Sequence, residues 1–244
     1  DVESCINGSK YVFHFAGVAD IGESSAKPYH TIETNVLSAA LVTEACIKAG
    51  VTKLMYASTM YVYSDQGSFY RASKQAAETI IETYHKETKL NYTIMRYGSL
   101  YGERSQSWNG LKNYVTQAVK EGKILYKGTG HERREYIHVK DAAKLSVDAL
   151  GDQYDNTSLT FTGFQVLQST ELLAMIKEIV GKPVEIIFSD KQKNAGHYEM
   201  TPYRFTPKTA KKLLPNEFTD IGQGILSLIE EIYHETNGVD KVRH

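Results

Sequence analysis

Apolar runs of strand length alternate with longer amphipathic segments along the first part of this chain. The runs are KYVFHFAG (10–17), VTKLMYAST (51–59) and NYTIMRYGSLYG (91–102). Between them, the segments 31–50 and 73–89 repeat apolar residues at helical spacing. Runs that are apolar throughout are typical of strands covered on both faces. The alternation therefore predicts an α/β fold built on a doubly wound parallel sheet.

Beyond residue 102 this regular alternation loosens. Helices are predicted at 109–123, 138–151, 169–181, 206–214 and 219–238, and strands at 156–163 and 184–190. We therefore expect the sheet domain to occupy residues 1–150 and a smaller mixed α/β region to occupy residues 151–244. The helix at 109–123 and the C-terminal helices can pack in space with either of these two regions.

Composition and charge exclude several classes of protein. The 244 residues are 41% hydrophobic and 23% charged, with a net charge of −1, so no nucleic acid and no membrane is expected as partner. The opening DVESCINGSK lacks the basic and apolar regions of a signal peptide, and a cytoplasmic location is expected. The two cysteines, Cys5 and Cys46, predict neither a disulfide framework nor a metal site.

A tyrosine and a lysine four residues apart carry the clearest chemical signal. Tyr70 and Lys74 fall on one face of the predicted helix, and Ser58 and Thr59 end the strand before it. An ammonium group about 4–6 Å from a phenol favours the phenolate, so Lys74 is expected to lower the pKa of Tyr70. Such a pair can take a proton from an alcohol and return it while a nicotinamide carries hydride. Tyr-x-x-x-Lys alone is a weak motif, and its place after a strand that ends in Ser-Thr strengthens it.

Several motifs in order resemble the extended short-chain dehydrogenase/reductase family, in its NAD-dependent nucleotide-sugar epimerase/dehydratase group. VFHFAG resembles the family's V-x-H-x-A-A/G loop, and YRASKQAAE resembles Y-x-x-S-K-x-x-x-E. MRYGSLYGER and GTGHERREYIHVKDAAK resemble R-Y-F-N-V-Y-G-P-R and G-x-G-x-x-x-R-D-F/Y-I-H-V-x-D-x-A. The resemblance implies a Rossmann-like NAD(P)-binding domain, a substrate-binding region, a nucleotide-sugar substrate and NAD as cofactor, with NADP as an alternative. A homodimer through the helices that bear Asn35 and Tyr70 is also implied.

The resemblance also implies a role for each matching residue. Tyr70 would be the acid/base, Lys74 would hold the cofactor ribose, and Thr59 would bind the sugar oxygen. The cofactor contacts implied are His14, Ala16, Gly17, Asn35, Ser58, Tyr70, Lys74, Tyr97, Gly98 and Ser99. The substrate contacts implied are Thr59, Ser99, Asn109 and Arg134. Two alternatives stay open, because His14 also fits a packed strand histidine and Asn35 also fits a structural hydrogen bond to a loop.

The chain departs from the family pattern in three places. The glycine-rich phosphate loop is absent, so the sequence is expected to be a fragment that lacks N-terminal βα units, or to have its sheet edge supplied by another chain. Met60 and Tyr61 stand where dehydratases carry an acid pair, which argues against dehydration. Only 11 positions separate Thr59 from Tyr70, and Ser99 replaces an Asn. These two changes leave the sugar undetermined.

The leading hypothesis is an NAD-dependent nucleotide-sugar epimerase acting at C4 through a 4-keto sugar. The alternatives are an NAD(P)H-dependent 4-keto-sugar reductase, a non-catalytic dinucleotide-binding relative and an inactive fragment. Among the remaining tyrosines, Tyr61 and Tyr63 are expected to be wall or core residues, and Tyr56 a packing residue.

Overall fold

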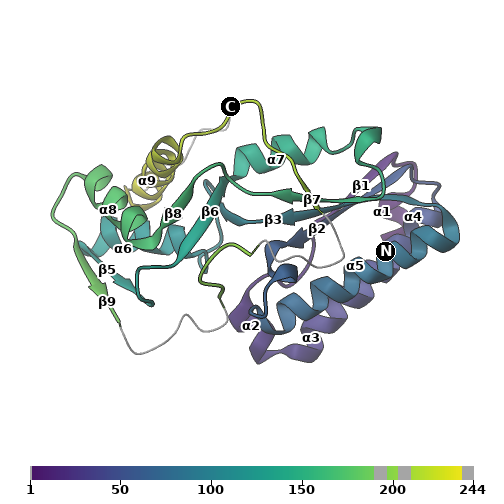
Figure 1. Cartoon of the computed structure of the whole chain (residues 1–244), viewed down its shortest axis with the longest axis horizontal. Coiled ribbons are helices and arrows are strands. Elements are labelled where there is room, and N and C mark those ends of the chain that lie inside the picture. The colour runs from purple at the N-terminus through teal and green to yellow at the C-terminus, as the bar shows by residue number, and fades with distance from the viewer. Residues whose placement is uncertain (1, 190–196, 203–209, 238–244) are drawn as a thin grey trace.

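A five-stranded parallel sheet forms one half of the molecule (Figure 1). The computed structural model describes residues 2–189, 197–202 and 210–237. The strand order is β1 (Tyr11–His14), β2 (Lys53–Thr59), β3 (Asn91–Tyr97), β7 (Thr157–Phe161) and β10 (Ala210–Lys212). All four pairings are parallel, so the carboxyl ends of the strands meet at one edge of the sheet. The predicted α/β parallel sheet is confirmed.

Helices cover both faces of this sheet, as its apolar strands require. One face packs against α1 (Val2–Ile6), α4 (Ser38–Lys48) and α5 (Ser68–Thr88), through a core that includes Leu54 and Ile94. The other face packs against α7 (Val139–Asp148). Between β1 and α4 lie α2 (Ile21–Ala26), α3 (Pro28–Ile32) and a π-helical turn (Glu33–Leu37).

A second hydrophobic core forms the other half of the molecule, at the left of Figure 1. It is built by α6 (Gly110–Glu121), α8 (Ser169–Val180), α9 (Ile221–Asn237) and the parallel pair β5 (Lys123–Tyr126) and β9 (Glu185–Phe188). A three-stranded sheet of β4 (Ser99–Tyr101), β6 (Arg133–His138) and β8 (Val166–Gln168) lies between the two halves. The helix predicted at 109–123 therefore packs in the second core.

The predicted elements hold with a few differences. The helix predicted at 73–89 begins five residues earlier, at Ser68 after Gly67 with φ of 100°, so Tyr70 and Lys74 both lie on it as expected. The run 91–102 breaks at Gly98 into β3 and β4. The helix predicted at 206–214 is wrong for its described residues, because 210–212 form β10, whose pairing with β7 outweighs helical propensity. Residues 206–209 lie outside the described part.

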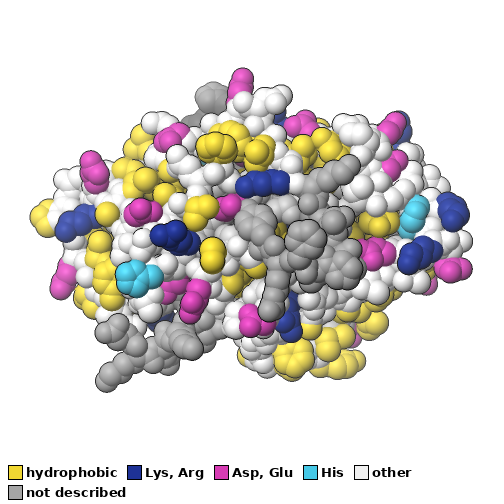
Figure 2. All heavy atoms as spheres, in the orientation of Figure 1, with side chains coloured by type: hydrophobic (Ala, Val, Ile, Leu, Met, Phe, Trp, Pro, Cys, Tyr) yellow, Lys and Arg dark blue, Asp and Glu magenta, His cyan; other side chains and the backbone are white. Residues whose placement is uncertain are grey.

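The five-stranded sheet extends beyond residue 150, where the boundary between the two regions was predicted. Strands β7 and β10 lie beyond that residue and yet belong to the five-stranded sheet. The predicted two-part division of function stays a prediction. Acidic and basic side chains are interspersed over the face seen in Figure 2. Within the described residues, no helix is both long and apolar enough to cross a membrane.

Candidate active site

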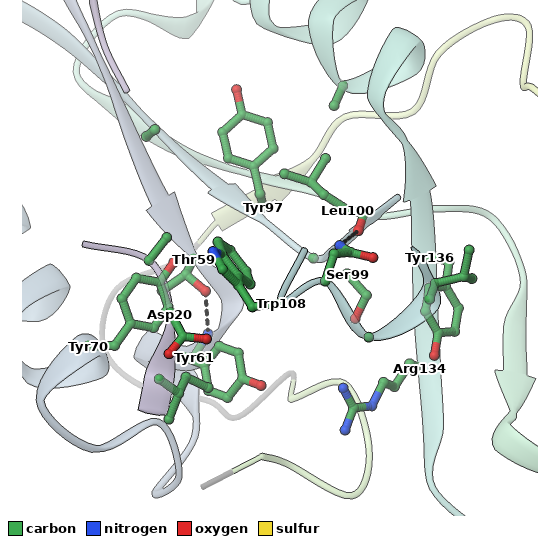
Figure 3. A pocket seen from close by; sticks show the side chains of 18 of the residues that line it. Asp20, Thr59, Tyr61, Tyr70, Tyr97, Ser99, Leu100, Trp108, Arg134 and Tyr136 are labelled. Atoms are coloured by element: carbon green, nitrogen blue, oxygen red, sulfur yellow. Dashed lines mark hydrogen bonds between the residues drawn. The ribbon is translucent and has the colours of Figure 1, made fainter. Parts of the chain in front are cut away.

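A cavity of about 590 Å³ opens at the carboxyl ends of the strands, where the sheet meets the second core (Figure 3). Ligands bind at this edge in open α/β sheets. The predicted site residues that line it are Gly17, Ser58, Thr59, Tyr70, Lys74, Tyr97, Gly98, Ser99, Asn109 and Arg134. Three predicted residues, His14, Ala16 and Asn35, do not line it. Residues 117 positions apart in the sequence, Gly17 and Arg134, thus share one cavity.

Tyr70 and Thr59 lie together on one wall of the cavity (Figure 3). Thr59 ends β2, and its Oγ1 accepts the amide hydrogen of Tyr61 at 3.2 Å. Burial raises the pKa of Tyr70 to about 12, although the hydrogen bond with Thr59 works to lower it. The phenol is therefore protonated at neutral pH.

The pKa of Tyr70 is raised, not lowered as expected from its spacing to Lys74. Lys74 Nζ donates to the Ala57 carbonyl at 2.8 Å and lies 4.9 Å from the centroid of the Tyr56 ring. Burial lowers the pKa of Lys74 itself to about 8, against the opposing charge of Glu78. Burial of Tyr70 dominates its pKa instead, because desolvation penalises a phenolate.

A buried ion pair fixes the strand end that carries Ser58 and Thr59. The Glu78 carboxylate on α5 accepts from Ser58 Oγ at 2.5 Å and from Arg96 on β3 at 2.7 and 3.0 Å. Arg96 also donates to the Tyr63 hydroxyl. Tyr63 is thus a core residue, as expected. The network ties β2, β3 and α5 together, so Thr59 and Tyr70 keep a defined separation.

Asn35 holds the loop that follows β1. Its Oδ1 accepts from Val18 N at 2.7 Å, and its Nδ2 donates to Val18 O and to Ser73 Oγ, both at 2.9 Å. A Cβ at Gly17 would lie 2.7 Å from this Oδ1, so only glycine fits there. The geometry favours the structural alternative for Asn35, and its contact with NAD stays a prediction.

His14 is likewise buried behind the cavity. Its ring lies 5.6 Å from the Tyr56 ring, and burial, with the Lys74 charge, lowers its pKa to about 4. This geometry favours the packed-histidine alternative. Ala16 is exposed next to the cavity-lining Phe15 and Gly17.

The cavity residues on β3, β4 and α6 make contacts of their own. The Tyr97 hydroxyl lies 2.5 Å from Ser146 Oγ, and Ser99 Oγ lies 3.4 Å from the Tyr198 hydroxyl. Asn109 caps α6 through its Oδ1 and donates to the Leu100 carbonyl at 2.9 Å. Its side chain therefore shapes the cavity wall, and its substrate contact stays a prediction.

Arg134 is the cation on the far wall. Its guanidinium lies 5.4 Å from the centroid of the Tyr198 ring. Within the described residues, no carboxylate lies within ion-pair distance of it. Burial opposes its charge, but neighbouring tyrosines, Tyr136 first, raise its pKa above the ordinary value. A half-buried guanidinium that lines a cavity and has no ion-pair partner among the described residues is suited to an anionic ligand. Arg133, by contrast, is exposed.

Some residues that line the cavity were not predicted as site residues from the sequence. They are Asp20, Trp108, His197 and Tyr198, while Tyr61 was expected only as wall or core. Asp20 is the N-cap of α2, and its Oδ1 accepts from Glu23 N at 2.5 Å. The capping position was readable from the sequence, but the segment at 197–202 gave no signal of its place beside β2.

Comparison with known proteins identifies the family to which the chain belongs. Residues 1–158 match the family described as "NAD dependent epimerase/dehydratase family". The chain belongs to that family. Family relatives include the UDP-glucose 4-epimerase of Bacillus subtilis, 28% identical over 76% of this chain and 65% of the relative. The UDP-glucuronate 4-epimerase of Thermodesulfobacterium geofontis is 24% identical over 70% of this chain and 57% of the relative.

Solved structures show the same fold. The UDP-glucuronic acid 4-epimerase of Bacillus cereus superimposes with a TM-score of 0.84 at 18% identity, over 96% of this chain and 79% of its own. The UDP-glucose 4-epimerase of Thermotoga maritima gives a TM-score of 0.81 at 22% identity, over 97% and 81%. The chain spans about half to two thirds of the length of the curated relatives it matches first.

Proposed function

We propose that this protein is an NAD-dependent epimerase of a nucleotide-activated sugar, acting at C4 through a transient 4-keto sugar. One observation carries the proposal. A single cavity holds Thr59, Tyr70 and Lys74 on one wall and the half-buried guanidinium of Arg134 on another. The first wall suits proton transfer at a sugar hydroxyl, and the second suits the diphosphate of a nucleotide sugar.

The residues present fit the nicotinamide end of NAD. Gly17 lines the cavity, and a Cβ there would lie 3.7 Å from Lys74 Nζ, so the ammonium lies just behind the loop. Lys74 would hold the ribose hydroxyls, and the bare backbone at Gly17 and Gly98 would allow close approach. When bound, NAD supplies the hydride acceptor and a positive ring charge that favours the Tyr70 phenolate.

The chain's own residues then handle the proton. Thr59 would hold the C4 oxygen by hydrogen bonding, and Tyr70 would take the hydroxyl proton and return it to the same oxygen. Arg134 would bind the diphosphate while the 4-keto sugar rotates so that its opposite face meets the nicotinamide. Met60 is buried and Tyr61 carries no carboxyl, so neither can drive loss of water as an acid pair does. This argues against a dehydratase.

Two measurements test the proposal. Calorimetric titration of NAD into the purified protein is expected to show binding, and failure to bind from a folded sample would contradict it. With NAD bound, UDP-glucose and UDP-galactose are expected to interconvert without net use of cofactor. Consumption of added NADPH on a 4-keto sugar would instead indicate the reductase. Binding of NAD without turnover of any nucleotide sugar would indicate a non-catalytic relative.

We also propose a homodimer. Leu37 and Leu41 are 59% and 49% exposed on the helical segment that carries Asn35, and they support an interface there. Light scattering on the purified protein is expected to give twice the chain mass, and a monomer at micromolar concentration would contradict this.

A further inference from the structure

A phenol and an imidazole are paired inside the cavity, beside the proposed catalytic residues. The Tyr61 hydroxyl lies 2.5 Å from His197 Nδ1, and both residues line the cavity. The Tyr61 and Tyr70 rings meet edge to face, with centroids 6.0 Å apart. Figure 3 shows the Tyr61 hydroxyl pointing into the cavity, toward the side where Arg134 lies. None of the roles proposed above uses this pair.

Long-range contacts build this pair from two distant segments. Tyr61 lies in the 3₁₀ turn Met60–Tyr63 that Thr59 caps. His197 comes from the segment 197–202, which runs along β6, where Arg133 N donates to Glu199 O at 2.7 Å and Thr201 N donates to Arg133 O at 3.2 Å. Tyr198 packs on Tyr61 with ring centroids 4.6 Å apart. The position of the hydroxyl is therefore held on several sides.

The pair is uncharged at neutral pH. Burial first, and then the charge of Arg134, lower the pKa of His197 to about 4 against the opposing charge of Asp20. Burial, followed by Tyr198, raises the pKa of Tyr61 above its ordinary value. A neutral phenol and imidazole offer a hydrogen-bond donor and acceptor but no charge. A sugar hydroxyl matches such a group. A carboxylate placed there would lose its hydration, and Arg134, whose charge reaches both Tyr61 and His197, is occupied by the diphosphate in the proposed function.

We propose that Tyr61, held by His197, is a specificity-determining residue that hydrogen-bonds an uncharged hydroxyl of the sugar and so selects a neutral hexose over a hexuronate. The inference rests on the proposed epimerase function, in which Arg134 is occupied by the diphosphate. A site that hydrogen-bonds a substrate hydroxyl discriminates strongly against a sugar that lacks this hydroxyl, because the polar groups of the site are then left without a partner.

The test compares UDP-glucose and UDP-glucuronate as substrates of the wild type, Tyr61→Phe, His197→Ala and His197→Asn. The wild type is expected to prefer UDP-glucose by about tenfold or more in kcat/KM. Tyr61→Phe and His197→Ala are expected to lose about tenfold on UDP-glucose and much less on UDP-glucuronate. His197→Asn is expected to recover part of the loss, because its amide can reach the position of Nδ1.

Tyr84→Phe is the matched control, because it removes a tyrosine hydroxyl that bonds to Glu44 at 2.7 Å on the exposed face of α5. It is expected to keep the wild-type preference. Melting temperatures of all variants exclude loss of fold as the cause. A wild type that prefers UDP-glucuronate, or a preference unchanged in Tyr61→Phe, would overturn this inference while leaving the epimerase intact. A wild type that turns over no nucleotide sugar would overturn both.

Discussion

Tyr70 is the residue on which the proposed chemistry depends most. Tyr70→Phe removes the proton-transferring hydroxyl, so kcat is expected to fall by about 10²–10⁴-fold. NAD affinity and melting temperature are expected to stay near wild type, because the ring and its packing on Tyr61 remain. Steady-state kinetics and calorimetric titration measure the two effects. Tyr233→Phe on α9 is the control, and turnover retained in Tyr70→Phe would remove the assignment.

Gly17 shows how one missing side chain supports the site. Gly17→Ala would bring a Cβ within 2.7 Å of Asn35 Oδ1 and displace the amide that holds the loop after β1. We expect a loss of about 1–3 kcal/mol in the free energy of unfolding, together with weaker NAD binding. Urea denaturation measures the first effect. Gly110→Ala, where the nearest atom is 3.9 Å from the new Cβ, is expected to change stability little. Equal effects of the two substitutions would contradict the argument.

Among the elements of secondary structure, α5 and the ends of β2 and β3 act as one unit through Glu78 and Arg96. Both side chains are about 99% buried, so breaking their pair leaves a charge without a partner. Glu78→Gln is expected to lose about 3–5 kcal/mol in the free energy of unfolding. Lys27→Met, which breaks the exposed pair with Glu23, is expected to change it little. Chemical denaturation compares them, and a Glu78→Gln protein as stable as wild type would contradict a structural role for the network.

Element boundaries show where local pattern was sufficient and where it was not. The strands β2 and β3 were predicted from their apolar runs because they are buried almost throughout, and helix α5 was predicted because it buries one face at helical spacing. Strand β10 was predicted as part of a helix, since the lysines and leucines of the segment 206–214 favour helix when no neighbour is considered. Its pairing partner β7 lies about 50 residues away, and such pairing leaves no local trace.

For the molecule as a whole, the buried His14 and the half-buried His197 predict an acid-sensitive fold. Burial lowers the pKa of both His14 and His197 to about 4, below the ordinary 6.5. The unfolded chain then binds these protons more readily, so stability is full above about pH 6.5 and falls as pH drops toward 4. The loss is on the order of 2–3 kcal/mol for each histidine.

The free energy of unfolding between pH 7 and pH 4 measures this dependence. Carboxylates add to it, so the comparison is with a His14→Gln/His197→Asn double variant, whose curve is expected to be flatter between pH 6.5 and 4. Parallel curves for the two proteins would contradict the assignment of the acid sensitivity to these two histidines.

The amino-acid sequence was sufficient for strands β1, β2, β3 and β7 of the sheet and for placing Tyr70 and Lys74 on one helix. Apolar periodicity encodes strands and helices locally, and the four-residue spacing of Tyr70 and Lys74 places them on one helix face whatever the rest of the chain does. Spacing carries no information about burial, however. The high pKa of Tyr70, the lack of an ion-pair partner for Arg134 among the described residues and the contact of Tyr61 with His197, 136 positions later, follow from packing between distant segments. Desolvation and long-range contact are properties of the folded chain, so the tertiary structure was needed to see them.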